Sequence, residues 1–118
     1  MPRFLLILTE ADHFHRWEES DDITRQEAFA AYNRFIEVVN NRGQILSGQA
    51  LLPPNRARTV RAGSALPTTE GPFAETVEQI GGFYLIEVSD LDEACELARL
   101  LPRGYGIEVR PCDDVSVY

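Results

Sequence analysis

The sequence predicts an α+β fold of the ferredoxin-like type, βαββαβ, with one inserted β-hairpin. Two observations predict it. Apolar runs of strand length alternate with two segments whose apolar residues recur at helical spacing. Setting the hairpin aside, this order is that of split β-α-β domains, in which both helices lie on one face of an antiparallel sheet. The length of 118 residues suits one domain, so we expect a single domain over residues 1–118.

The first half of the chain predicts a strand, a loop and a long helix. Residues 4–9 are continuously apolar, which is typical of a central strand covered on both faces. Residues 10–22 are polar and acidic and predict a loop. A helix begins near Thr24, because Thr24 and Glu27 match a capping box. One apolar stripe then continues to the stop at Gly43 and comprises Phe29, Tyr32, Phe35, Ile36 and Val39.

The middle of the chain predicts a second strand and the inserted hairpin. Residues 44–52 form the strand, which ends at Pro53 and Pro54 because proline cannot donate to the ladder. Residues 56–62 and 65–69 flank a Gly63-Ser64 turn and predict a hairpin over about 56–69.

The last part predicts strand, helix and strand. Residues 73–80 predict a short polar loop or helical turn, and residues 83–88 give the strongest strand pattern in the chain. Ser89 and Asp92 resemble a second capping box, which opens a helix that ends at Pro102. Residues 107–110 form the last strand, and residues 113–118 form an acidic tail.

Two of these strands are apolar on both sides, which predicts a homodimer. The strand at 83–88 places Phe83, Leu85 and Glu87 on one face and Tyr84, Ile86 and Val88 on the other. Only one face can meet the helices, and soluble proteins rarely leave a large apolar patch exposed. We therefore expect two copies of the sheet to pack face to face.

Composition excludes several classes of function. All 11 basic residues are arginines, so Schiff-base chemistry and a lysine-containing phosphate loop are excluded. The formal charge of −8 argues against nucleic acid as a direct partner. No membrane segment or signal peptide is visible, Cys95 and Cys112 form no redox or zinc motif, and no cofactor is indicated. We expect a cytoplasmic protein.

Four segments carry a resemblance to a known family: residues 70–76, 78–88, 90–94 and 107–111. Together they closely resemble the DGPF family within the YCII-related superfamily. The resemblance runs from Phe4 to Pro111. It implies a ferredoxin-like fold paired into a dimeric α/β barrel, and no settled activity. The first motif position is Glu70, where the family usually has aspartate. In the YCII branch a histidine and an aspartate on the first helix form a proposed catalytic dyad, but alignment on Gly43 puts Tyr32 and Asn41 at those places.

The motif around Glu70 is the first candidate site. Held on a stiff Gly-Pro turn beside an apolar interface, the Glu70 carboxylate would be a general base with a pKa raised by burial. The alternative is that it only satisfies backbone donors of the loop. The candidate ligand-binding residues are Glu70, Phe73, Glu75, Gln79, Tyr32 and Glu87.

His13 and His15 are the second candidate for catalysis. In an extended loop both side chains would point the same way, and with Asp12 or Glu10 they would form an acid-base or metal site. A third and fourth ligand are not evident, so we expect no metal. Surface histidines of this kind also occur without any function.

Three further residue sets have a structural and a functional interpretation. Glu87 lies among apolar neighbours and needs a partner, for which Arg3 or Arg110 is suited. The arginines Arg56, Arg58 and Arg61 either bind an anion or form a solvated hairpin edge. Tyr32 and Trp17 either line a ligand cleft or belong to the core.

Two functions remain open after this reading. The first is a small-molecule-binding or accessory module that works as a homodimer. The second is a cofactor-free lyase, isomerase or dehalogenase-type enzyme that uses a carboxylate in the barrel pocket. The absence of the histidine-aspartate dyad favours the first. The feature that discriminates the two is whether an enclosed, ligand-sized pocket contains Glu70 or Tyr32 together with His13 or His15.

Overall fold

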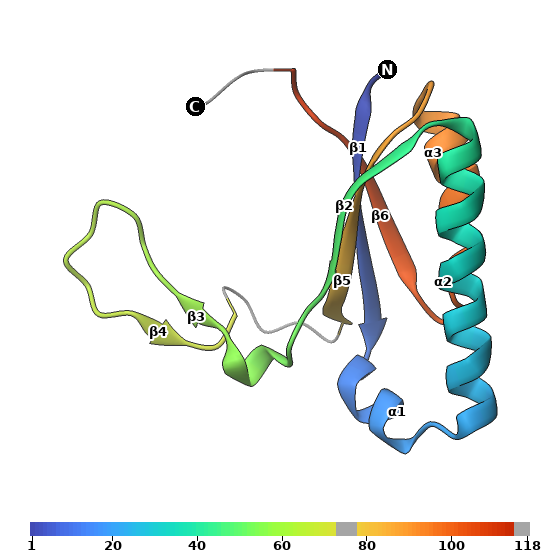
Figure 1. The fold of residues 1–118 in the computed structure, drawn as a ribbon. Coiled ribbons are helices and arrows are strands. Elements are labelled where there is room, and N and C mark those ends of the chain that lie inside the picture. The colour runs from blue at the N-terminus through green and yellow to red at the C-terminus, as the bar shows by residue number, and fades with distance from the viewer. Residues whose placement is uncertain (73–77, 115–118) are drawn as a thin grey trace.

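The computed structural model describes residues 1–72 and 78–114 and contains the elements drawn in Figure 1. They are β1 (Arg3–Ala11), α1 (His13–Glu19), α2 (Asp22–Arg42), β2 (Gln44–Ala50), the 3-10 turn η1 (Pro54–Arg56), β3 (Arg58–Thr59), β4 (Thr69–Glu70), β5 (Glu78–Glu87), α3 (Leu91–Ala98) and β6 (Gly106–Pro111). The predicted α+β class is confirmed, since the helices accompany an antiparallel sheet. None of the helices in the described part is long and apolar enough to cross a membrane.

The main sheet has four strands in the order β2-β5-β1-β6, and each neighbouring pair is antiparallel. Leu6 in the central strand β1 lies opposite Tyr84 in β5 and Val109 in β6. A β-bulge interrupts the pairing of β1 and β5 just after Leu8, where Leu8 pairs with Gly82 and Thr9 with Ile80. Gly81 is thereby left without a partner on β1, at the end of the sheet that faces α1.

Helices α2 and α3 cover one face of this sheet (Figure 1). Between them and the sheet, the largest fully buried side chains are Phe35, Leu6, Ile86, Val39 and Val88. Complete burial of an aliphatic or aromatic side chain stabilises a fold by roughly 1.5–3 kcal/mol. This core fixes α2, and α2 in turn supplies one wall of the site described below.

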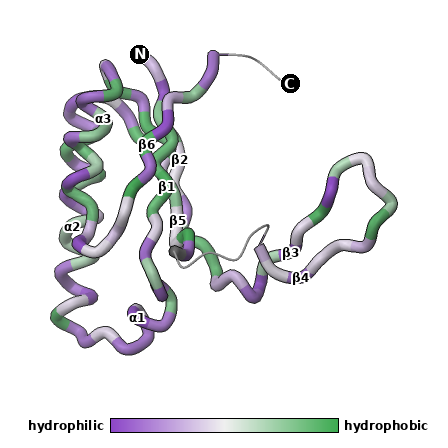
Figure 2. Tube along the Cα trace, turned by 180° about the vertical axis from the view of Figure 1, so that it is seen from behind, coloured by the Kyte–Doolittle hydropathy of each residue, from purple (hydrophilic) through white to green (hydrophobic). Residues whose placement is uncertain are grey.

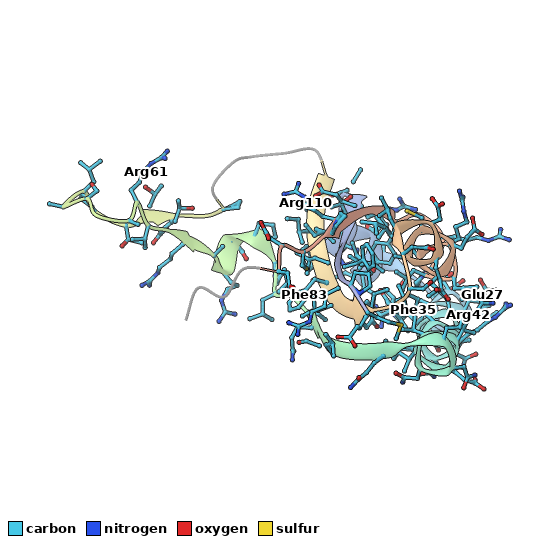
Figure 3. All side chains as sticks on the ribbon, turned by 90° about the horizontal axis from the view of Figure 1, so that it is seen from above. Glu27, Phe35, Arg42, Arg61, Phe83 and Arg110 are labelled. Carbon is cyan, nitrogen blue, oxygen red and sulfur yellow. The ribbon has the colours of Figure 1, made fainter. Side chains whose placement is uncertain are left out.

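The opposite face of the sheet has no helix over it. The predicted division of β5 is confirmed: Ile86 and Val88 are buried in the core, whereas Phe83, Leu85 and Glu87 lie on the other face and are only partly covered. Leu5 and Ile7 of β1 pair with Leu85 and Phe83 and share this open face. Figures 2 and 3 show the segment around β3 and β4 extending from the sheet on the side away from the helices.

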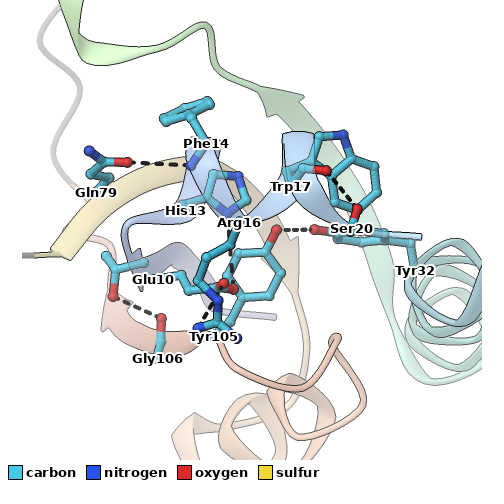
Figure 4. Close-up of polar contacts among 11 residues, drawn as sticks. Glu10, His13, Phe14, Arg16, Trp17, Ser20, Tyr32, Gln79, Tyr105 and Gly106 are labelled. Atoms are coloured by element: carbon cyan, nitrogen blue, oxygen red, sulfur yellow. Dashed lines mark hydrogen bonds and ion pairs between the residues drawn. The ribbon is translucent and has the colours of Figure 1, made fainter. Parts of the chain in front are cut away.

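The predicted loop at residues 10–22 is wrong. Strand β1 continues to Ala11, and His13–Glu19 form helix α1. Short helices are marginal on propensity alone and depend on packing. Here the packing is nonlocal: the side-chain amide of Gln79 accepts a hydrogen bond from the Phe14 amide at 3.4 Å, across the gap between β5 and α1 (Figure 4).

Several predicted boundaries also shift. The carboxylates that cap α2 and α3 belong to Asp21 and Asp90, which accept from the amides of Thr24 and Glu93. The hairpin turn at Gly63 is present, but its ladder is limited to Arg58–Thr59 and Thr69–Glu70, so the two strands are much shorter than predicted. Strand β5 begins at Glu78, earlier than predicted, because it pairs with the extended end of β1.

Candidate functional site

A cavity of about 780 Å³ opens between α1, α2 and the β2-β5 side of the sheet. A volume of this size suits a small organic molecule. Helix α1 supplies His13, Phe14 and Trp17, and helix α2 supplies Phe29, Tyr32 and Ile36. The remaining wall comes from the sheet and adjoining segments and consists of Leu8, Ile45, Gly48, Gln49, Ala50, Leu51, Leu52, Pro53, Gly81, Gly82, Phe83, Tyr84 and Tyr105.

The junction of the two helices forms the aromatic end of the cavity. The rings of Trp17 and Phe29 meet edge to face at 5.7 Å between centroids. Arg25 lies over the Trp17 ring at 5.3 Å, and its guanidinium donates to the Trp17 carbonyl at 2.8 Å and to the Ser20 hydroxyl at 2.9 Å. Arg25 thus holds the end of α1 against α2 and fixes the position of the indole.

His13 is the imidazole of the cavity, and its side chain is only 11% exposed. Its ring lies 5.3 Å from that of Tyr105 between centroids, and it packs against Gly81 so closely that a Cβ atom there would lie 2.6 Å from Nε2. Burial lowers the pKa of His13, and the nearby carboxylate of Glu10 partly offsets this. The imidazole is therefore neutral at pH 7 and able to accept a proton.

Glu10 lies beside His13 at the end of β1 (Figure 4). Its Oε2 atom is 4.0 Å from Nδ1 of His13, and its Oε1 atom is 3.3 Å from the Arg16 guanidinium. The distance to His13 is too long for a hydrogen bond, although catalytic contacts often tighten only when a ligand binds. Because the Glu10 side chain is 12% exposed, its charge acts on the imidazole with little screening by solvent.

A pair of tyrosines provides the hydroxyl groups of the site. Tyr32 of α2 donates a hydrogen bond of 2.9 Å to the Tyr105 hydroxyl, which precedes β6 (Figure 4). Burial raises the pKa of Tyr32, Tyr84 and Tyr105, so all three are neutral phenols at pH 7. When Tyr32 donates, the Tyr105 oxygen accepts and the Tyr105 proton remains available to a ligand.

Residues 4–113 match the family of the YCII-related domain. The chain belongs to this family. An uncharacterized protein of Rhizobium meliloti (strain 1021) is 37% identical over 100 residues, which cover 80% of this chain and 77% of that protein.

The two histidines of this YCII-related domain do not converge. The prediction that they point the same way is wrong, because it assumed an extended loop. Two residues apart on helix α1, they lie on different sides. His15 is 59% exposed and pairs with Glu19 at 3.2 Å. Among residues 1–72 and 78–114, no cluster of three or more histidine, cysteine, aspartate or glutamate side chains is arranged to hold a metal ion.

The residues predicted around the DGPF-like motif are dispersed. Glu70 is exposed at the end of β4, on the hairpin, and is not among the residues that line the cavity. Phe73 and Glu75 lie outside the described residues. Gln79 holds α1, and Glu87 lies on the open sheet face with the Arg3 guanidinium 3.6 Å away. The predicted pairing of Glu87 with Arg3 is confirmed.

The sequence named His13, Tyr32 and Trp17, which line the cavity, and Glu10, which lies beside His13, but it gave no role to Tyr105. Tyr105 occupies a position with a recognisable signal, because it stands between two glycines immediately before a strand. Because β1 and β6 are neighbours, the end of one lies next to the start of the other, and Thr9 pairs with Gly106.

Proposed function

We propose that this YCII-related domain is a small-molecule-binding module whose ligand occupies the cavity between α1, α2 and the sheet. The single observation that carries the proposal is the composition of that cavity. About 780 Å³ of space has mainly apolar and aromatic walls, and a few polar groups converge in it, chiefly His13, Tyr32 and Tyr105. Ligand sites combine apolar walls with a small number of polar groups in this way.

The module works as a homodimer in this proposal, with the open faces of two sheets packed together as in a dimeric α/β barrel. The apolar side chains on that face support it: Leu5 and Ile7 of β1 lie next to Leu85 and Phe83 of β5. The strand order β2-β5-β1-β6 with helices on one side supports a ferredoxin-like domain, and the motif that begins at Glu70 supports the DGPF branch. The span 1–118 as one domain and a cytoplasmic location stay predictions.

A second candidate function is cofactor-free acid-base catalysis, as in a lyase or isomerase. The observation that favours it is the presence of His13 and Tyr32 in one cavity, with Glu10 at 4.0 Å from His13. A neutral imidazole would take a proton from the substrate, and Glu10 would stabilise the resulting imidazolium. The carboxylate in this arrangement is Glu10, which the sequence also placed with the histidines, whereas the other candidate, Glu70, does not line the cavity.

A thermal-shift screen with metabolites tests both functions. We expect a ligand that raises the melting temperature of the wild type and fails to do so when Ile36→Arg fills the cavity with a charged side chain. Turnover of that ligand, lost in His13→Gln and kept in the matched variant His15→Gln, would select the enzyme. Stabilisation without turnover would select the binding module, and stabilisation that survives Ile36→Arg would contradict a ligand in this cavity.

A further inference from the structure

The cavity walls contain no permanent charge among the described residues. Apart from His13, the titratable side chains that line it are those of Tyr32, Tyr84 and Tyr105, and none of the lining residues is an arginine, an aspartate or a glutamate. Such an uncharged lining does not suit a charged ligand, and it contrasts with the chain as a whole, in which 25% of the residues are charged. Burying an unpaired charge is costly, so charged ligands are normally met by an opposite charge.

The two charged side chains nearest to the cavity already have partners and do not line it: Glu10 pairs with Arg16, and Arg25 donates to Trp17 and Ser20. At one end the carboxylate of Glu10 lies 4.0 Å from the imidazole of His13, and it would repel an anion placed against that ring. At the other end the guanidinium of Arg25 already lies over the Trp17 ring at 5.3 Å. A ligand cation stacked on the indole would therefore meet a positive charge, although aromatic walls by themselves often attract cations.

One hydrogen-bond donor is prepared in this uncharged space. The Tyr105 hydroxyl accepts a 2.9 Å hydrogen bond from Tyr32, and within the part of the chain that the structure describes its own proton has no other acceptor. A hydroxyl that accepts such a bond becomes a stronger donor, because hydrogen bonds in a chain polarise one another. The natural partner for this proton is an oxygen that only accepts, such as a carbonyl.

We propose that the cavity selects an uncharged, largely aromatic or aliphatic carbonyl compound whose oxygen accepts a hydrogen bond from Tyr105. The inference rests on the proposed binding function and adds the chemical class of the ligand to it. Carboxylates and ammonium compounds of the same size should bind more weakly, because no arginine, aspartate or glutamate lines the cavity within residues 1–72 and 78–114. Hydrocarbons bind more weakly because they leave the Tyr105 hydroxyl desolvated and unpaired.

The experiment uses the full chain and a fluorescent probe, N-phenyl-1-naphthylamine, at pH 8, where His13 is neutral. Trp17 is the single tryptophan and lines the cavity, so energy transfer from it to the probe reports binding, and loss of that transfer in Ile36→Arg assigns the probe to this cavity. The probe is then displaced by four compounds that share one ring system: 1-acetonaphthone, 1-methylnaphthalene, 1-naphthoate and protonated 1-naphthylmethylamine.

We expect 1-acetonaphthone to displace the probe best and both charged compounds to bind at least about tenfold more weakly. Tyr105→Phe should lower the affinity for 1-acetonaphthone by about two- to tenfold and leave 1-methylnaphthalene unchanged, since one net hydrogen bond is lost. Tyr32→Phe, which removes the donor to Tyr105 but keeps the carbonyl contact, should cause a smaller loss in the same direction. It also provides the test if Tyr105→Phe fails to fold.

Two results would overturn the ligand class while leaving the binding function intact. One is displacement by 1-naphthoate or the amine at the concentration that suffices for 1-acetonaphthone. The other is an equal effect of the tyrosine variants on 1-acetonaphthone and 1-methylnaphthalene. No energy transfer from Trp17 to the probe in the wild type would instead overturn the binding function, and the ligand class with it.

Discussion

The imidazole of His13 lies directly against the backbone of Gly81, so that a Cβ atom at residue 81 would lie 2.6 Å from Nε2. Gly81 has no partner on β1, because the bulge after Leu8 shifts the register there. The absence of a side chain at this position lets the ring of helix α1 approach the sheet. A glycine inside a strand often marks such a close approach.

Gly81→Ala should therefore displace His13 and lower the free energy of unfolding by about 1–3 kcal/mol, as overpacking does. The measurement is urea denaturation of the single variants and of the double variant Gly81→Ala/His13→Ala. Removing the imidazole should recover much of the loss, which a double-mutant cycle isolates. If Gly81→Ala lowers the free energy of unfolding equally in the His13→Ala background, the imidazole is not the reason why residue 81 must be glycine.

Titration of His13 provides a second prediction. Burial lowers its pKa below 6.5 and Glu10 opposes that effect, so Glu10→Gln should lower the pKa of His13 further. The charged and titratable groups around the ring are Glu10 of β1, Arg16 of α1 and Tyr105 before β6. Proton NMR in a His15→Asn background, which leaves a single histidine, measures the shift. Glu19→Gln is the matched control, and a rise of the pKa in Glu10→Gln would contradict the arrangement.

The same shift makes stability depend on pH. A histidine whose pKa is lower in the folded state contributes stability above its unfolded value of 6.5, and this contribution is lost as the pH falls through the folded pKa. The free energy of unfolding should therefore decrease below pH 6.5, and the decrease should be smaller in His13→Gln. Denaturation curves of both chains between about pH 7.5 and about pH 5, the range in which histidines titrate, measure this decrease.

The tyrosine pair predicts a loss of stability on the alkaline side. Tyr32, Tyr84 and Tyr105 all have a folded-state pKa above the ordinary value of 10.0, so their contribution is complete below pH 10.0 and is lost as the pH rises through the folded values. At neutral pH, Tyr32→Phe should cost about 0.5–1.5 kcal/mol for its hydrogen bond. Tyr84→Phe is the control, because within the described residues the Tyr84 hydroxyl makes no hydrogen bond. Equal losses in the two variants would argue that the Tyr32 hydrogen bond adds nothing.

Much of the fold could be predicted because its signals are local. The continuous apolar run that begins at Phe4 and the alternation along β5 determine which side chains meet the helices, and the structure buries Leu6 and Ile86 accordingly. The predicted starts of the two long helices are less accurate, because a cap depends on a single side chain. The pattern favours Thr24 and Ser89, whereas the nearby Asp21 and Asp90 cap the helices.

The site was predictable only in part, because it depends on contacts between distant segments. Helix α1 has too few residues to form on propensity and is held by Gln79 and by Arg25, so its sequence resembled a loop. That error placed His13 beside His15, whereas the helix turns His13 toward Glu10 and Tyr105. The Glu70 motif predicted a site on the hairpin instead of in the cavity, because a sequence motif gives no information on which cavity its residues line.

The open face of the sheet provides the last prediction. If two copies pack through it, Leu85→Arg would bring two arginines together in an apolar interface, and like charges across an interface cost several kcal/mol. Light scattering at micromolar concentration should give the mass of a dimer for the wild type and that of a monomer for Leu85→Arg. The folded monomer should persist, since Leu85 lies outside the core of Phe35, Leu6 and Ile86. Leu91→Arg, on the exposed side of α3, is the matched control and should remain dimeric. A wild-type chain that is monomeric, or a Leu85→Arg chain that is still dimeric, would contradict packing through this face.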